Sequence, residues 1–420
     1  MTGPLPSKGW KILSLLRYKH GMATSKKPKA TIVCISHLEW TDTLFQRPQQ
    51  VMSRLSKRHH VIYYKEWAFR EWIHGKAAPG SIAGLCRKVN SSLAICDFAM
   101  PLPRFRNHLK LFEDIGHWLA LRRIRSLIGE DFGGPLILWY YFPVFLELIR
   151  SLGPDRVVYE CMDNYVALSH NTPGSIVAGV KEREARLLQR ADIIFYGSQT
   201  LMDERSGHRH KSRHFPTGVD TEHFARGMEG QAPLPADIKG LQKPMLGYWG
   251  AVDQRIDYAV LDRCARQRPD WSIVLIGPMV TISERDISSF LALPNVHWLG
   301  PKAYQELPRY ARAFDICMLP FKTTDEGKYL NPTKTLEYLA AGRPVVSTKI
   351  PEIERFYSDM VAVAQSGSDL VRKCESILAR EPDPVEQDRR LAKAKGHSWN
   401  AMVDQMEKIA MPLPLFSDVS

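Results

Sequence analysis

The sequence lacks paired cysteines: its seven cysteines are scattered over 420 residues and none forms a Cys-x-x-Cys pair. They are Cys34, Cys86, Cys96, Cys161, Cys264, Cys317 and Cys374. Zinc sites and disulfide-rich folds need clustered cysteines, so the pattern argues against both. An odd number of dispersed cysteines is typical of a reducing compartment, and we expect a cytoplasmic location.

Long apolar runs are also missing, since no stretch reaches the ~18 residues that span a bilayer. The apolar segments at 30–36 and 135–142 have the length of strands. The N-terminal segment 10–17 is short, interrupted by charge and followed by no small-residue cleavage site, so we do not interpret it as a signal peptide. No Asp-x-Asp follows a predicted strand, and we therefore expect no metal site and no cofactor.

Positive charge is in excess, with a formal net charge of +12 and a pI near 9.3. Basic residues concentrate at 26–29, 104–125 and 205–213. Phosphate-bearing substrates or an anionic membrane surface would explain this excess, whereas no nucleic-acid-binding motif accompanies it. The segment 104–125 mixes aromatic and cationic residues at helical spacing, so it is either a helix resting on an anionic membrane or a packed helix with a solvated basic face.

Strands and helices alternate twice along the chain, which predicts an α/β protein with two doubly wound parallel sheets. We expect a basic N-terminal arm at 1–28, a first domain at 29–226, a Gly/Pro-rich linker at 227–243 and a second domain at 244–396. A helix and tail at 397–420 would pack back on the first domain. The predicted strands are 30–35, 60–64, 92–96, 136–140, 157–159, 192–196, 213–215, 244–249, 271–276, 296–299, 316–319 and 344–347.

The most informative segment is 329–347, in which polar residues gather at one end of a predicted helix. Pro332 suits the first turn, and Thr333 lies at the start, where free N–H groups and the helix dipole favour a phosphate. Lys334 would add a positive charge, and Glu337 could accept two hydrogen bonds from a ribose diol. The alternative is a helix with an ordinary surface Lys–Glu pair.

In this block the chain resembles the GT-B glycosyltransferases with a glycosyl transferases group 1 C-terminal domain, whose motif is Glu-x7-Glu followed by Ala-x-Gly-x-Pro-Val-Val. The match includes Glu337, 341–342 and 344–346, and it continues through 246–250 and other parts of the second domain. The resemblance implies two Rossmann-like domains facing an interdomain cleft, with a nucleotide sugar on the second domain. It assigns the donor ribose to Glu337 and the diphosphate to Lys334.

The first glutamate of the family motif is replaced here by Tyr329, so a retaining reaction lacks its usual sugar contact. Asp325, Glu326 or the hydroxyl of Tyr329 could substitute for it.

Glycines after the first strands of the second domain would let phosphate approach the backbone closely. Gly250 is such a residue, and Arg255 either contacts the diphosphate or lies on the surface beyond a tight turn. By position and resemblance, Gly277 and Tyr304 would flank the nucleobase.

In the first domain, polar and aromatic residues follow the first strand in a loop that resembles that of bacterial capsule and exopolysaccharide transferases. Trp40, Gln46 and Arg47 would bind the acceptor sugar, or they simply cap the following helix. Asp163 lies just past the strand at 157–159, where an inverting transferase needs a general base, although an Asx-turn is the alternative. This layout resembles that of the beta-glucuronosyltransferases of xanthan-type assembly.

Three histidines, at positions 208, 210 and 214, lie among basic residues, and without nearby carboxylates we interpret them as part of a solvated loop. The sequence therefore predicts a metal-independent hexosyltransferase of cell-surface polysaccharide synthesis, with a saccharide or polyprenyl-linked acceptor. It would be peripheral on the inner face of the plasma membrane. A nucleotide-sugar 2-epimerase and an inactive GT-B scaffold are the alternatives.

Overall fold

The computed structural model describes residues 30–40, 45–66, 86–98, 110–129, 134–165, 174–229, 233–323, 330 and 332–411. The predicted arm at 1–28 lies outside the described residues, as does part of the linker at 230–232. The same holds for Asp325, Glu326 and Tyr329, so the structure does not place the three groups considered for the missing glutamate.

The first sheet has eight strands in the order β3-β4-β2-β1-β5-β6-β7-β8, and every pair except β3–β4 is parallel. The strands are β1 (Thr31–Ser36), β2 (His60–Glu66), β3 (Cys86–Asn90), β4 (Leu93–Phe98), β5 (Leu136–Tyr140), β6 (Arg156–Cys161), β7 (Ile193–Tyr196) and β8 (Ser212–His214). Central strands such as β1 are buried along their whole length, which is why they are continuous apolar runs in the sequence.

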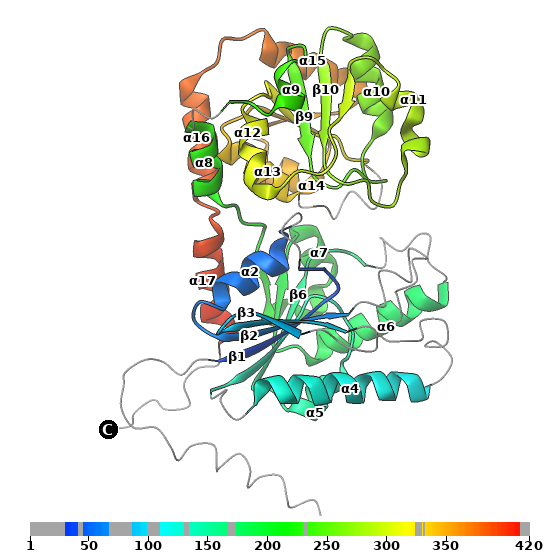
Figure 1. Ribbon diagram of the computed structural model, residues 1–420, viewed down its shortest axis with the longest axis vertical. Coiled ribbons are helices and arrows are strands. Elements are labelled where there is room, and N and C mark those ends of the chain that lie inside the picture. The colour runs from blue at the N-terminus through cyan, green and yellow to red at the C-terminus, as the bar shows by residue number, and fades with distance from the viewer. Residues whose placement is uncertain are drawn as a thin grey trace, which may run out of the picture.

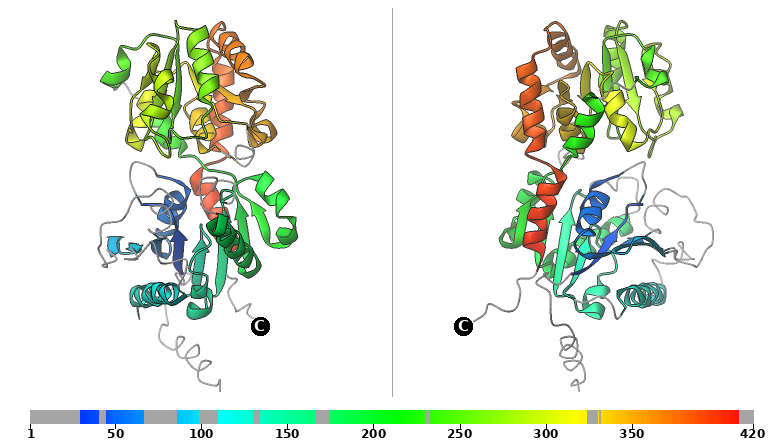
Figure 2. Two further views of the ribbon diagram at one scale, coloured as in Figure 1. Left: turned by 90° about the vertical axis from the view of Figure 1, so that its right-hand side faces the viewer. Right: turned by 60° about the vertical axis from the view of Figure 1, so that its left-hand side comes forward.

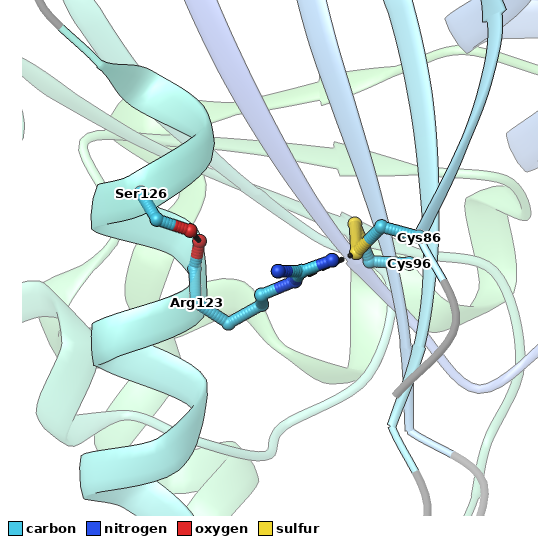
Figure 3. Close-up of a disulfide and its surroundings, with 4 residues drawn as sticks. All are labelled: Cys86, Cys96, Arg123 and Ser126. Carbon is cyan, nitrogen blue, oxygen red and sulfur yellow. Dashed lines mark hydrogen bonds between the residues drawn. A yellow bond between two sulfur atoms is a disulfide. The ribbon is translucent and has the colours of Figure 1, made fainter. Parts of the chain in front are cut away.

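Two features of this sheet contradict the expectations from sequence. The edge strand β3 is antiparallel to β4, and it was not predicted because its residues beyond Cys86 are exposed and include one apolar residue, Val89. Its register sets Cys86 opposite Cys96, and the two form a disulfide (Figure 3). The cysteine spacing did not indicate this single disulfide, because a local antiparallel hairpin pairs residues that the spacing alone does not relate.

The second sheet has six parallel strands in the order β11-β10-β9-β12-β13-β14. They are β9 (Met245–Trp249), β10 (Ser272–Ile276), β11 (Val296–Trp298), β12 (Ile316–Leu319), β13 (Val345–Thr348) and β14 (Val361–Ala364). The predicted α/β class with two doubly wound sheets is confirmed, and Figure 1 shows the two domains stacked end to end.

Helices cover both faces of each sheet. On the first sheet, one apolar layer packs under α4, α5 and α6, and a separate layer packs under α2 and α17 (Figure 1). No helix in the described part of the chain is long and apolar enough to cross a membrane. The α-helices are α2 (Arg47–Leu55), α4 (Lys110–Ile128), α5 (Glu147–Leu152), α6 (Gly174–Arg190), α7 (Gln199–Glu204), α8 (Thr221–Glu229), α9 (Ala236–Lys239), α10 (Tyr258–Gln267), α11 (Ser288–Leu291), α12 (Leu307–Ala311), α13 (Thr333–Ala340), α14 (Pro351–Tyr357), α15 (Gly367–Leu378), α16 (Pro384–Lys395) and α17 (Trp399–Ala410).

The chain passes between the domains twice. After β8 it enters α8, which packs on α12 and α13, and after α16 it returns in α17, which packs on α2 (Figure 2). The two passages touch, because Val219 N donates to His397 O at 3.0 Å and Trp399 N donates to Val219 O at 3.1 Å.

A second interdomain contact lies between α7 and α14. The buried carboxylate of Glu352 accepts hydrogen bonds from Ser198 Oγ at 3.1 Å and from Thr200 N at 3.1 Å. Beside it, the ring of His214 stacks on Phe356 with centroids 5.3 Å apart.

Candidate donor and acceptor site

Glycines follow two neighbouring strands of the second sheet at its carboxyl edge. Gly250 directly follows β9 and has a φ of 135°, and Gly277 directly follows β10 and has a φ of 139°. Residues that carry a side chain rarely adopt this backbone conformation. A Cβ on Gly277 would lie 1.8 Å from the carbonyl oxygen of Gly250, so the two backbones need this residue type to approach each other. This edge is where open parallel sheets bind their ligands.

Lys334 lies directly against Gly250. A Cβ on Gly250 would come within 2.0 Å of Lys334 Cε and 2.6 Å of its Nζ. The ammonium also lies over the rings of Tyr248, at 5.5 Å, and Phe321, at 5.8 Å. Among the described residues no carboxylate forms an ion pair with Lys334. Burial and the nearby Arg255 lower the pKa of Lys334 to about 8.

The start of α13 offers unsatisfied donors next to this ammonium. Pro332 at the N-cap makes no side-chain capping bond, and the first turn contains no acidic residue. The first turn of α13 therefore supplies no acidic side chain to neutralise the positive end of the helix dipole, and an anion would be favoured there. Thr333 is half-buried at the first position of this turn.

Glu337 lies one turn further along α13 and is oriented by Trp249. The indole Nε1 of Trp249 donates to Glu337 Oε2 at 2.7 Å, while the ring packs edge-on against Tyr338 with centroids 4.3 Å apart. Burial raises the pKa of Glu337, and the Trp249 hydrogen bond and Lys334 act in the opposite direction. One carboxylate oxygen is thus held by the protein, and the other has no hydrogen-bond partner among the described residues.

The sequence predicted that Arg255 contacts the diphosphate or lies on the surface, whereas the structure pairs it with Asp253. Its guanidinium forms a bidentate pair with Asp253, with Nε 3.0 Å and Nη2 2.5 Å from Asp253 Oδ2. Although burial opposes the charged form, the hydrogen bonds to Asp253 raise the pKa of Arg255. It is near enough to interact electrostatically with both Lys334 and Asp163.

Asp163 comes from the other domain, two residues after β6, and lies near enough to Arg255 for their charges to interact. Burial raises the pKa of the Asp163 carboxyl, and the positive charge of Arg255 partly counteracts this effect. The structure therefore brings the proposed base and the proposed diphosphate site to the same interdomain region.

Tyr304 lies near Glu337, on the side where α8 packs. Burial and the charge of Glu337 raise the pKa of its hydroxyl. Its ring stacks on His223 with centroids 4.5 Å apart, and its carbonyl oxygen pairs with His223 Nε2 at 3.0 Å. One face of Tyr304 is therefore already covered by a residue of the interdomain passage.

The three acceptor candidates of the first domain do not form a single surface. Arg47 is 4 % exposed, pairs with the fully buried Glu160 and donates to Pro216 O at 2.7 Å. Its charge is satisfied inside the domain, so the expectation that Arg47 meets an acceptor is not supported. Trp40 packs edge-on against Tyr63, with centroids 4.9 Å apart, and Gln46 is exposed at the N-cap of α2 without a side-chain capping bond.

Sequence reasoning missed Trp249, Asp253 and His223, because nothing in a strand-end tryptophan or a loop aspartate reveals its partner. In the described ranges, no group of three or more His, Cys, Asp or Glu side chains is placed to hold a metal ion. Of the three histidines in the basic loop, His214 is the one that packs against the second domain.

Comparison with known proteins indicates the family and the fold of the chain. Residues 244–380 match the family model described as glycosyl transferases group 1. The glycosyltransferase TuaH of Bacillus subtilis, assigned to teichuronic acid biosynthesis, is 30% identical over 282 residues, covering 64% of this chain and 70% of that protein. A GDP-mannose-dependent monoacylated alpha-(1-6)-phosphatidylinositol monomannoside mannosyltransferase of Corynebacterium glutamicum is 23% identical over 273 residues, or 58% of this chain and 68% of that protein.

Solved structures show the same fold over most of the chain. Sucrose-phosphate synthase from Thermosynechococcus elongatus superposes with a TM-score of 0.65 at 16% identity, covering 91% of this chain and 98% of that one. A glycosyltransferase from Rickettsia africae gives a TM-score of 0.61 at 12% identity, again covering 91% and 98%.

The two facing sheets and the matches together define a nucleotide-sugar glycosyltransferase of the GT-B fold. Within that class, the chain belongs to the glycosyl transferases group 1 family.

Proposed function

We propose that the donor diphosphate binds at the start of α13, between the backbone of Gly250 and the ammonium of Lys334. The observation that carries this proposal is the contact of Lys334 with Gly250, which puts a half-buried ammonium without an ion-pair partner among the described residues beside the N–H groups of the first turn of α13. A diphosphate would satisfy both, and it would be stabilised as a leaving group by the same contacts. Thr333 and Arg255 border this position. Arg255 would act at longer range, because its guanidinium is already hydrogen-bonded to Asp253.

The donor nucleoside would extend from there along the glycine edge. Glu337, held by Trp249 through one oxygen, would accept hydrogen bonds from the ribose diol with the other. Gly277 and Tyr304 would border the nucleobase, since they follow the neighbouring strands β10 and β11.

Asp163 would act as general base in an inverting transfer. The acceptor hydroxyl oxygen forms a bond to the anomeric carbon while the bond from that carbon to the diphosphate oxygen breaks. The hydroxyl proton passes to the Asp163 carboxylate, and the nucleoside diphosphate leaves with the electron pair of the broken bond. A raised pKa suits this role because it makes the carboxylate a stronger base.

The acceptor would be a hydroxyl of a saccharide or lipid-linked glycan in cell-surface synthesis. This follows the two relatives, one assigned to teichuronic acid biosynthesis and one to a phosphatidylinositol mannoside. Transfer of a hexose without a metal is part of the proposal, because Lys334, Arg255 and the helix end supply the positive charge that a metal would otherwise provide. Trp40 and Gln46 remain the candidates for acceptor contact.

The experiment is a thermal-shift screen with UDP- and GDP-sugars, followed by measurement of nucleoside diphosphate release with candidate saccharide acceptors. The variant Asp163→Asn should bind the donor like the wild type but turn over about 10²–10⁴ times more slowly. The variant Lys334→Ala should weaken donor binding itself by about tenfold or more.

Three results would redirect the proposal. Conversion of the donor into its epimer without release of nucleotide would indicate a 2-epimerase. Donor binding without release for any acceptor class would indicate an inactive scaffold. If Asp163→Asn turns over normally, the base is another group.

A further inference from the structure

A surface pocket lies on the side of the first domain that faces away from the second domain. It has a volume of about 690 Å³ and is formed where α4, α5 and α6 meet. Figure 1 shows α4 and α5 at the far end of the domain from the proposed donor site. The lining residues are Leu121, Arg125, Leu146, Glu147, Arg150, Ser151, Arg186 and Arg190.

The charge of this pocket is strongly unbalanced. Four arginines face one glutamate, and that glutamate is 3.4 Å from the guanidinium of Arg186. Arg125 donates to the carbonyl oxygen of Ser151 at 2.9 Å, which leaves its charge uncompensated. Among the described residues neither Arg150 nor Arg190 has an ion-pair partner. Guanidinium groups that outnumber the nearby carboxylates four to one are suited to bind phosphate oxygens.

An exposed tryptophan adjoins the pocket on the same helix. Trp118 is 52% exposed, and it precedes the pocket residues Leu121 and Arg125 by three and seven positions, which places all three on one face of α4. The guanidinium of Arg122 lies 5.5 Å from the Trp118 ring. Tryptophan with arginine at its edge is the combination that proteins place at the boundary between lipid headgroups and acyl chains.

We propose that this face of α4, α5 and α6 binds an anionic lipid membrane, with Trp118 at the headgroup level and a lipid phosphate in the arginine pocket. The pocket volume falls in the range of about 300–1,000 Å³ that holds one small ligand, so it fits one headgroup rather than the backbone of a polymer. Its apolar part, formed by Leu121 and Leu146, would contact the glycerol end of the lipid.

Vesicle flotation at low salt tests this proposal with the full chain. The wild type should float with mixed phosphatidylcholine and phosphatidylglycerol vesicles and not with phosphatidylcholine alone. The double variant Arg150→Glu with Arg190→Glu should reduce the bound fraction at least about tenfold, because each basic residue contributes to attraction by the surface. Trp118→Ala should also weaken binding, and by a smaller factor that persists at higher salt.

Matched controls lie on the second domain. The double variant Arg266→Glu with Arg372→Glu makes the same charge change at residues 56% and 74% exposed, and Val385→Ala removes a side chain that is 67% exposed. These controls should float like the wild type. Donor turnover with a water-soluble acceptor should be unchanged in the pocket variants, which shows that they are folded.

Three results would overturn the proposal. The wild type could fail to float with anionic vesicles. The control double variant could lose binding as much as the pocket variant, which would mean that only net charge matters. Inorganic phosphate or glycerol phosphate could stabilise the wild type through Arg150 and Arg190 while vesicles do not bind, which would assign the pocket to a free phosphate compound.

Discussion

Each domain has a basic residue at the start of a helix on the carboxyl side of its sheet, but the two residues differ in their partners. Arg47 begins α2, is almost fully buried and is paired with Glu160. Lys334 is the second residue of α13, is half-buried, and has aromatic rings as its neighbours. The nearest acidic residue on its helix, Glu337, is bound to Trp249 instead.

We propose that the same local pattern has two uses. In the first domain the carboxylate that neutralises the cation is supplied by the protein, so the pair stabilises the fold. In the second domain the described residues supply no such carboxylate, and the position remains open to an anionic ligand. On this proposal, the difference between a structural and a binding residue lies in the partner and not in the position along the helix.

The largest effect should come from breaking the first pair. Replacing Arg47 by Ala leaves Glu160 buried without its cation, and we expect the free energy of unfolding to fall by about 3–5 kcal/mol in urea denaturation. Arg58→Ala is the control, since Arg58 is 43% exposed and should change stability by less than about 1 kcal/mol. If the Arg47→Ala protein is as stable as the wild type and loses only turnover with the acceptor, Arg47 has a binding role and the two domains do not differ in this respect.

The next effect concerns the second cation. Lys334→Met should weaken donor binding by about 10- to 150-fold, the equivalent of a lost charged hydrogen bond of about 1.5–3 kcal/mol, without loss of stability. Calorimetric titration with the nucleotide sugar measures the affinity. Lys349→Met, a change at an exposed lysine paired with Glu354, should have no effect. Equal affinity of Lys334→Met and wild type would mean that the diphosphate binds elsewhere.

The lowered pKa of Lys334 predicts that donor affinity depends on pH. With a pKa of about 8 the ammonium loses its proton between pH 7 and 9, and donor affinity should fall about tenfold across that range. Because the unfolded chain keeps this proton up to the ordinary value of 10.5, stability should rise with pH over the same range. Lys334→Arg stays charged and should show no such fall in affinity; an identical fall in this variant would assign the titration to another group.

The smallest effect is expected from Trp249→Phe, which keeps an aromatic ring but removes the N–H that holds Glu337. The KM for donor should rise by about fivefold, equivalent to about 1 kcal/mol, with little change in kcat. The preference for a ribose over a dideoxyribose donor should fall as well. Trp271→Phe, at a buried site beside β10, should leave that preference intact. If both variants behave alike, Trp249 has only a packing role.

The sequence predicted the strands with buried apolar runs, the class of fold, and the clustering of Lys334 and Glu337 at one edge of the second sheet. It missed β3, whose residues after Cys86 are exposed and show no apolar pattern. It also assigned Arg47 to the acceptor, because Glu160 lies 113 residues further along the chain and no local signal indicates their pairing. In each case a contact distant in sequence or set by strand register decided the outcome.

The contact between the two interdomain passages has a mechanical consequence. The backbone of Val219 is hydrogen-bonded to both His397 and Trp399, so the two segments that connect the domains are joined at this point. A rigid-body rotation of one domain against the other would pivot at that junction, and opening would be greatest at the points furthest from it. A chain shortened before His397 would keep every strand of both sheets and lose this shared pivot.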